Sequence, residues 1–94
     1  MKSYKDMYSE NMIIKREHEI DEKLKMLKLL FKQRKLNSSV YYSEGWLIVA
    51  LTSKDGDQLA FYYQNPILVF YIFYSILTYL SEHGGIEKWQ IPKN

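Results

Sequence analysis

The sequence predicts a small α+β protein in which two helices flank a short antiparallel sheet. Three observations support this class. Apolar residues recur at helical spacing between residues 13 and 36, β-branched and aromatic residues fill residues 40–63, and an uncharged apolar run covers residues 66–80. A chain of 94 residues has the size of one domain, so we expect one domain over residues 1–94.

The first predicted element is a long helix over residues 13–36, which follows an N-terminal arm at 1–12. Acids lead this helix and bases close it, an order that suits the helix dipole. At 1.5 Å per residue the helix is about 36 Å long, whereas a compact chain of this size has a radius of gyration of about 12–13 Å. The helix should therefore extend beyond its own domain. Its apolar stripe consists of Ile13, Ile20, Leu24, Leu27 and Phe31.

The exposed part of this stripe has two interpretations. Either a second copy of the chain covers it, and two-fold dimers are the commonest such assembly, or the first turns of the helix fray. We favour the homodimer. The predicted partner interface contains Ile13, Ile20, Leu24, Tyr71 and Tyr74.

Residues 40–63 predict an antiparallel sheet. The segments 46–52 and 58–63 are joined by Asp55-Gly56, a hairpin dipeptide, and Ser43-Glu44-Gly45 marks an earlier turn. The sheet is either this hairpin alone or a meander with a further strand at 40–42.

Two tyrosine pairs, at 41–42 and 62–63, lie in the predicted strands. Strand alternation sends one member of each pair to either face of the sheet. These tyrosines either pack against the helices, stack on nucleic-acid bases or anchor a protein partner. Packing is the default interpretation.

Asn65-Pro66 predicts the N-cap and first residue of a second helix at 66–82, and Gly84-Gly85 predicts its C-cap. Its uncharged part is about 24 Å long, shorter than a hydrocarbon core of about 30 Å. Tyr71 and Tyr74 also lie opposite its apolar face. A helix packed on the sheet is therefore favoured over one that also forms a dimer contact, and over a membrane span.

An extended C-terminal tail is predicted at residues 86–94. Trp89 and Ile91 are expected on one side of it, and it could add a short edge strand that Pro92 ends.

The composition excludes several kinds of chemistry. The chain has no cysteine, so disulfides, thiolate zinc sites and cysteine nucleophiles are absent, and an intracellular, cytoplasmic protein is favoured.

The acids at 17–22 scatter around the helix and form no acid–base pair. His18 and Glu22 have i,i+4 spacing but no second ligand cluster. We expect no enzyme, no metal site and no cofactor.

A lysine ridge is the most specific functional feature of the sequence. Its members recur at spacings of three, four and three residues beside the apolar stripe: Lys25, Lys28, Lys32 and Lys35. Such a ridge could contact phosphates of DNA or RNA without recognising bases. The alternative is an ordinary solvated helix face. The second functional hypothesis is binding of a protein, such as inhibition of a host factor, through exposed tyrosines.

The segment YYSEGWLIVALTSKDGDQLAFYY at 41–63 belongs to a chain with nine tyrosines and no cysteine. In this composition the protein resembles the small orphan proteins of viruses, particularly filamentous viruses of archaea, and phage accessory proteins are similar. The resemblance implies an accessory role inside an infected host cell. It assigns no function to any residue.

Overall fold

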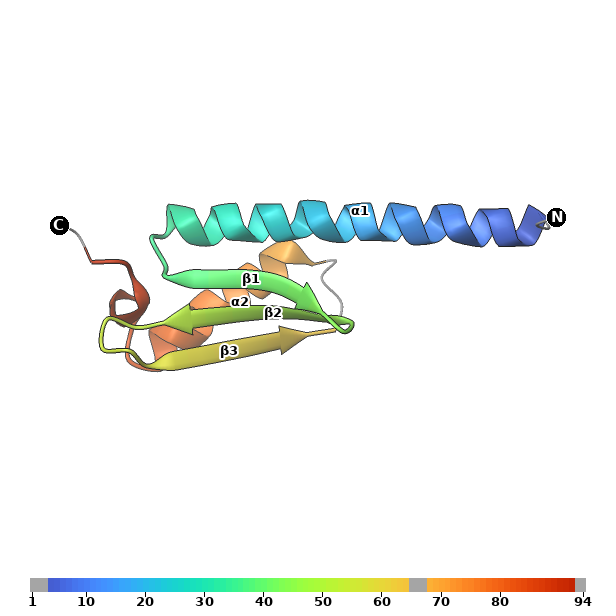
Figure 1. Cartoon of the computed structure of the whole chain (residues 1–94). Helices are drawn as coiled ribbons and strands as arrows, with labels where there is room; N and C mark the ends of the chain where they lie inside the picture. Colours follow the sequence, from blue (N-terminus) through green and yellow to red (C-terminus); the bar gives the residue numbers. More distant parts are fainter. Residues whose placement is uncertain (1–3, 65–67, 93–94) are drawn as a thin grey trace.

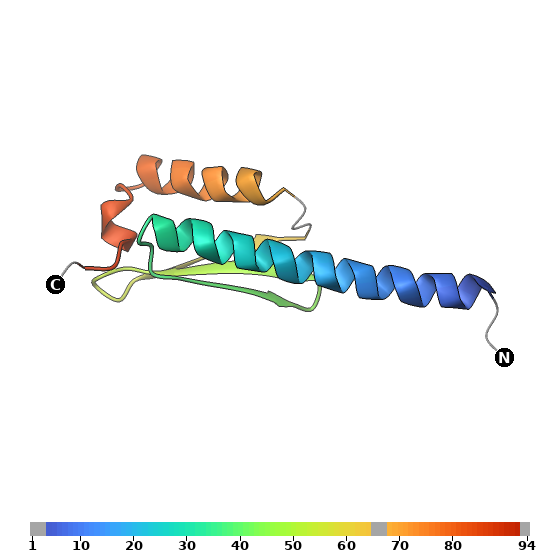
Figure 2. The same ribbon diagram turned by 90° about the horizontal axis from the view of Figure 1, so that it is seen from above.

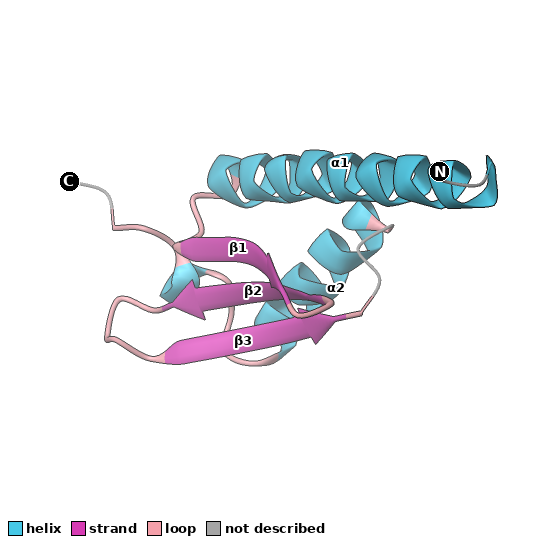
Figure 3. Ribbon diagram, turned by 45° about the vertical axis from the view of Figure 1, so that its right-hand side comes forward, coloured by secondary structure: helices cyan, strands magenta, loops and turns pink. Residues whose placement is uncertain are grey.

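Two helices lie against one face of a three-stranded antiparallel sheet (Figures 1 and 3). The computed structural model describes the backbone of residues 4–64 and 68–92, and the side chains of these segments from His18 onward. The elements follow in the order α1 (Tyr4–Gln33), β1 (Ser38–Ser43), β2 (Trp46–Thr52), β3 (Gln58–Tyr63), α2 (Val69–Glu82) and the 3₁₀ helix η1 (Glu87–Trp89).

The sheet is a meander with the strand order β1-β2-β3. Glu44 and Gly45 form the turn between β1 and β2, and both have positive φ, 51° and 83°. This is the combination that a two-residue type I′ hairpin turn requires. In the turn between β2 and β3, the buried Ser53 hydroxyl accepts hydrogen bonds from the backbone N–H groups of Asp55 (3.2 Å) and Asp57 (2.9 Å). These turns set the register in which Tyr41 faces Ile48 and Ile48 faces Tyr62.

The core lies between the inner face of the sheet and the two helices. Leu27 and Phe31 of α1 are fully buried, and Phe31 packs against Phe73 of α2 with ring centroids 5.3 Å apart. Phe61 of β3 meets Tyr79 of α2 edge to face at 5.4 Å. The amphipathic stripe of each helix is therefore turned toward the sheet. The remaining buried apolar residues are Leu36, Val40, Leu47, Val49, Leu51, Val69, Ile72, Ile76, Leu80 and Trp89.

The N-terminal part of α1 extends well beyond the sheet (Figures 1 and 2). The molecule measures 59 × 26 × 20 Å and its radius of gyration is 16.7 Å, compared with about 12–13 Å for a compact chain of this length. The difference comes from this projecting helix. No helix in the described part of the chain combines the length and apolarity that a membrane crossing needs.

The fold has the α+β class, but the predicted fold description is wrong at its C-terminal end. Residues 86–94 were expected to be an extended tail, whereas Glu87–Trp89 forms the turn η1. This turn rotates the chain, so Trp89 is buried while Ile91 is 54% exposed. The backbone N–H of Asn37 donates to the Trp89 carbonyl at 3.0 Å, and Leu36 and Gln90 form an isolated antiparallel bridge. The chain thus turns to bury the large indole side chain and does not form the predicted edge strand.

The bounds of α1 also differ from the prediction. The helix starts at Tyr4, so residues 4–12 are not an arm; neither glycine nor proline interrupts this segment. It ends at Gln33 because Lys35 has a φ of 60°, outside the right-handed helical region.

The sheet and α2 require smaller corrections. β1 covers Ser38–Ser43, so the meander, and not the hairpin alone, is the observed sheet. α2 begins at Val69, three residues later than predicted. The predicted cap residues Asn65 and Pro66 lie outside the described residues.

Candidate nucleic-acid interface

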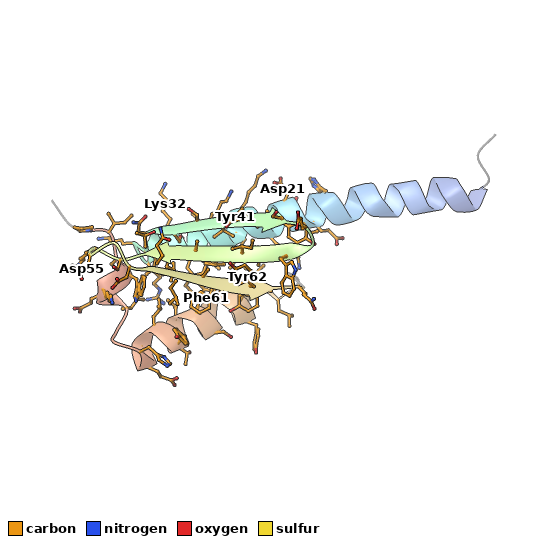
Figure 4. The ribbon with its side chains drawn as sticks, turned by 60° about the horizontal axis from the view of Figure 1, so that its bottom comes forward. Asp21, Lys32, Tyr41, Asp55, Phe61 and Tyr62 are labelled. Carbon is orange, nitrogen blue, oxygen red and sulfur yellow. The ribbon has the colours of Figure 1, made fainter. Side chains whose placement is uncertain are left out.

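The lysines predicted to form one ridge lie in two different parts of the fold. Lys25, Lys28 and Lys32 are exposed on α1, whereas Lys35 is exposed in the turn that follows it. The three helical lysines share one side of α1 because their spacing of three and four residues matches the helical repeat. In Figure 4, Lys32 extends from α1 away from α2, on the side where Tyr41 of β1 also lies.

The lysines of this ridge differ in whether a neighbouring acid neutralises their charge. Lys25 forms an ion pair with Asp21, with 3.1 Å between Nζ and Oδ2. Among the described side chains, Lys28 and Lys32 have no ion pair. Between Lys28 and Lys35 the sequence contains four bases and no acid. The C-terminal half of α1 is thus a surface of unbalanced positive charge.

A polar groove continues this surface beyond the end of α1. Arg34 and Lys35 line one side and Lys54, from the turn between β2 and β3, lines it too. Gln90 fixes the wall by donating a hydrogen bond from Nε2 to the Arg34 carbonyl at 2.8 Å. Glu87 is the acid in this groove. No sequence pattern predicts that Arg34 and Lys54 share a groove, because only the fold places the β2–β3 turn beside the end of α1.

Lys88 lies near the groove but is engaged elsewhere. Its ammonium group is 2.8 Å from Oδ2 of Asp57. The hydrogen bond and the charge of Asp57 raise the pKa of Lys88. Lys88 is therefore a weaker candidate for phosphate contact than Lys54.

The outer face of the sheet carries a second group of exposed side chains. Tyr41 and Tyr62 point outward and are 47% and 60% exposed, while their neighbours Tyr42 and Tyr63 pack against the core. Trp46 is 40% exposed and meets Tyr62 edge to face at 6.5 Å. Strand alternation predicts that the members of each tyrosine pair lie on opposite faces, but it does not predict which member is exposed, and no pattern in the sequence marks Trp46 as part of this group.

Four of the five predicted interface residues have described side chains, and these four are divided between the two helices. Ile20 and Leu24 are half-buried on α1, and Leu24 packs against the core. Tyr71 and Tyr74 lie on the outer side of α2, where they are 66% and 57% exposed. The side chain of Ile13 lies outside the described residues.

The outer side of α2 is a shallow groove in its own right. Tyr71, Tyr74 and Tyr79 line it together with Ser75, Thr78 and Glu82. Tyr79 stacks on His83 with ring centroids 4.0 Å apart, and the Tyr79 carbonyl lies 2.8 Å from Nδ1 of that histidine. This groove has aromatic walls and one acid, so its character differs from that of the basic side of α1.

The described residues offer little for metal or acid–base chemistry. His18 and Glu22 form an exposed i,i+4 pair at 3.1 Å. No group of three or more possible ligands occurs among the residues that the structure describes. Tyr63 is half-buried, and its pKa is raised by burial and, to a smaller extent, by Tyr71.

Comparisons with protein-family models, with curated proteins and with solved structures found no match to this chain. The surfaces described above are therefore the basis for a functional assignment.

Proposed function

We propose that the protein is a non-enzymatic accessory protein that binds the phosphate backbone of nucleic acid through the basic side of α1. The observation that carries this proposal is the positive charge between Lys28 and Lys35, where Lys28 and Lys32 are exposed and have no ion pair among the described side chains. Exposed lysines of this kind contribute sequence-independent contacts with phosphates.

The groove at the end of α1 supports the same proposal. Arg34, Lys35 and Lys54 extend the positive surface around the end of the helix. A nucleic-acid strand that lies across α1 would therefore contact positively charged side chains along the helix and again at its C-terminal end. Similar composition to small viral proteins supports an accessory role in a host cytoplasm.

The test is the salt dependence of binding to a DNA duplex. In Lys28→Gln/Lys32→Gln, each lost phosphate contact should reduce the slope of log affinity against log salt by about 0.9. Lys28→Arg/Lys32→Arg is the matched control, because it keeps both charges and should keep the slope. Asp21→Asn should strengthen binding, since it frees Lys25 from its ion pair. Equal slopes for the Gln variant and the parent would refute the proposal.

We also propose that the protein is a homodimer in which a second copy covers part of the projecting α1. This helix extends beyond the sheet that covers the rest of it (Figure 1), and Ile20, on the stripe that faces the domain, is only half-buried. Sedimentation equilibrium should give twice the mass of 11.3 kDa. A monomer throughout the micromolar range would contradict this assembly.

A second candidate function is binding of a host protein through the outer side of α2. Tyr71 and Tyr74 are more than half exposed there, and exposed aromatic side chains frequently anchor protein interfaces. Replacement of both by Ala should abolish capture of a defined partner from host lysate and leave DNA binding unchanged. Capture that survives this replacement would reject the surface.

A further inference from the structure

We infer that the outer face of the sheet holds unpaired bases, so that the nucleic acid bound by this protein is single-stranded. The inference rests on the backbone binding proposed above and specifies its ligand. Three features carry it: the composition of the face, the placement of its aromatic rings, and its position relative to the basic side of α1.

The composition of this face is unusual for a sheet surface that no described element covers. One face of an antiparallel sheet normally meets solvent with polar residues. Here the outward positions of the three strands carry no charged residue. They are Ser39, Tyr41, Ser43, Trp46, Ile48, Ala50, Thr52, Gln58, Ala60 and Tyr62.

The aromatic rings are placed where flat ligands could stack. Tyr41 and Tyr62 occupy one cross-strand row on either side of Ile48, so their backbones lie about 10 Å apart at the usual strand spacing. Ser43, Glu44, Trp46, Ile48 and Tyr62 line a shallow hollow at one end of this row. Small residues, Ala50 and Ala60, occupy the next outward row. A planar base could therefore approach the rings without displacing a large side chain.

The charge distribution selects nucleic acid as the occupant. Lys32 extends on the same side as Tyr41 (Figure 4), so phosphates on the basic side of α1 would border the β1 edge of the uncharged face. Bases attached to those phosphates could then reach the rings. Stacking on aromatic side chains accepts any base, which agrees with outward strand positions that carry no charged residue. Glu44, in the turn between β1 and β2, is the acid that borders the hollow. A duplex keeps its bases stacked inside and cannot use this face.

The experiment compares binding of oligothymidylate with binding of a duplex of the same length. The parent should bind the single strand more tightly. Trp46→Ala and Tyr62→Ala should each weaken single-strand binding by roughly 5- to 100-fold, the usual contribution of one stacked base, and change duplex binding little. Tyr71→Ala is the matched control: it removes an exposed tyrosine from α2 and should leave both affinities unchanged.

Tryptophan fluorescence supplies a second measurement. Trp46 is exposed whereas Trp89 is buried, so base stacking should quench the signal of Trp46. Trp46→Phe keeps an aromatic ring and is the control for a Trp46→Ala variant that fails to fold. It should retain most of the affinity for oligothymidylate and lose the fluorescence quenching.

The outcomes separate this inference from the function on which it rests. If Trp46→Ala and Tyr62→Ala bind oligothymidylate as the parent does, the sheet face is not the base site, although Lys28→Gln/Lys32→Gln could still weaken binding. If that lysine variant binds like the parent, the backbone function itself fails. If Trp46→Ala instead dissociates a dimer in the absence of DNA, the occupant is a second copy of the chain and the inference is overturned.

Discussion

The two faces of the sheet are built from alternate residues of the same three strands, and they differ sharply in what covers them. On the inner face, Leu47, Val49 and Leu51 of β2 are fully buried under the helices. On the outer face, Trp46 and Tyr62 remain 40% and 60% exposed. Adjacent residues with similar apolar character thus have opposite environments. The inner face is explained by packing, whereas the outer face needs a functional explanation.

The largest expected effect compares Leu47 with its neighbour Ile48. Leu47→Ala should reduce the free energy of unfolding by about 2–5 kcal/mol, the usual cost of removing a fully buried leucine. Ile48→Ala should cost clearly less, because this side chain is only half-buried on the outer face. Urea unfolding of both variants provides the measurement. Equal losses would show that another chain covers the outer face in solution.

The same comparison applies along α1. Leu27 is fully buried, while Leu24, one turn earlier, is half-buried. Leu27→Ala should again cost about 2–5 kcal/mol, and Leu24→Ala should cost less in a monomer. If a second copy covers Leu24, the loss at that position should approach the loss at Leu27 and depend on protein concentration. Thermal unfolding at several protein concentrations separates the two cases.

A smaller effect is expected at the turn that sets the register of the two faces. Gly45 has a φ of 83°, and an added Cβ would meet no atom within 4 Å. The cost of Gly45→Ala is therefore conformational, about 1–2 kcal/mol. Gly45→Asn should cost less because asparagine tolerates the left-handed region. If Ala and Asn reduce the unfolding midpoint equally, backbone conformation is not the cause.

The sequence was informative where a local pattern determines the structure. Alternation and the turn dipeptides predicted β2 and β3 within their observed bounds, and helical spacing predicted that Leu27 and Phe31 share one face. The sequence was less informative where contacts between residues far apart in the chain determine the structure. Nothing local shows that Trp89 is buried in the core and that its carbonyl accepts a hydrogen bond from Asn37, where η1 forms in place of the predicted tail.

In the candidate site, too, local patterns predicted some features and contacts between distant residues determined the others. Periodicity placed three lysines on one side of α1, but the positive φ at Lys35 ended the helix before the fourth. Arg34 and Lys54 line one groove only because the β2–β3 turn lies beside the end of α1. Alternation could not say that Tyr41 and Tyr62, and not Tyr42 and Tyr63, would be exposed, since that choice depends on which face the helices cover.

The smallest expected effect is a pH dependence that belongs to the inner face. Burial, and secondarily the nearby Tyr71, raises the pKa of Tyr63 above its ordinary value. The folded protein therefore holds the phenolic proton to higher pH than the unfolded chain does. This contribution to stability is fully present below about pH 10 and is lost as the pH rises through the folded-state pKa. Tyr63→Phe, which cannot ionise, should lose less stability than its parent when the pH is raised above 10.

The raised pKa of Lys88 acts in the same direction in this pH range, so it must be separated from the effect of Tyr63. Asp57→Asn replaces the carboxylate, whose hydrogen bond and charge raise the pKa of Lys88, with a neutral amide. Tyr63→Phe is therefore best compared in that background, with urea midpoints measured at neutral pH and above pH 10. A smaller alkaline loss for Tyr63→Phe would show that the inner face disfavours the phenolate. Parallel losses with and without the Tyr63 hydroxyl would mean that water reaches this tyrosine, and the division between the two faces would be weaker than the structure indicates.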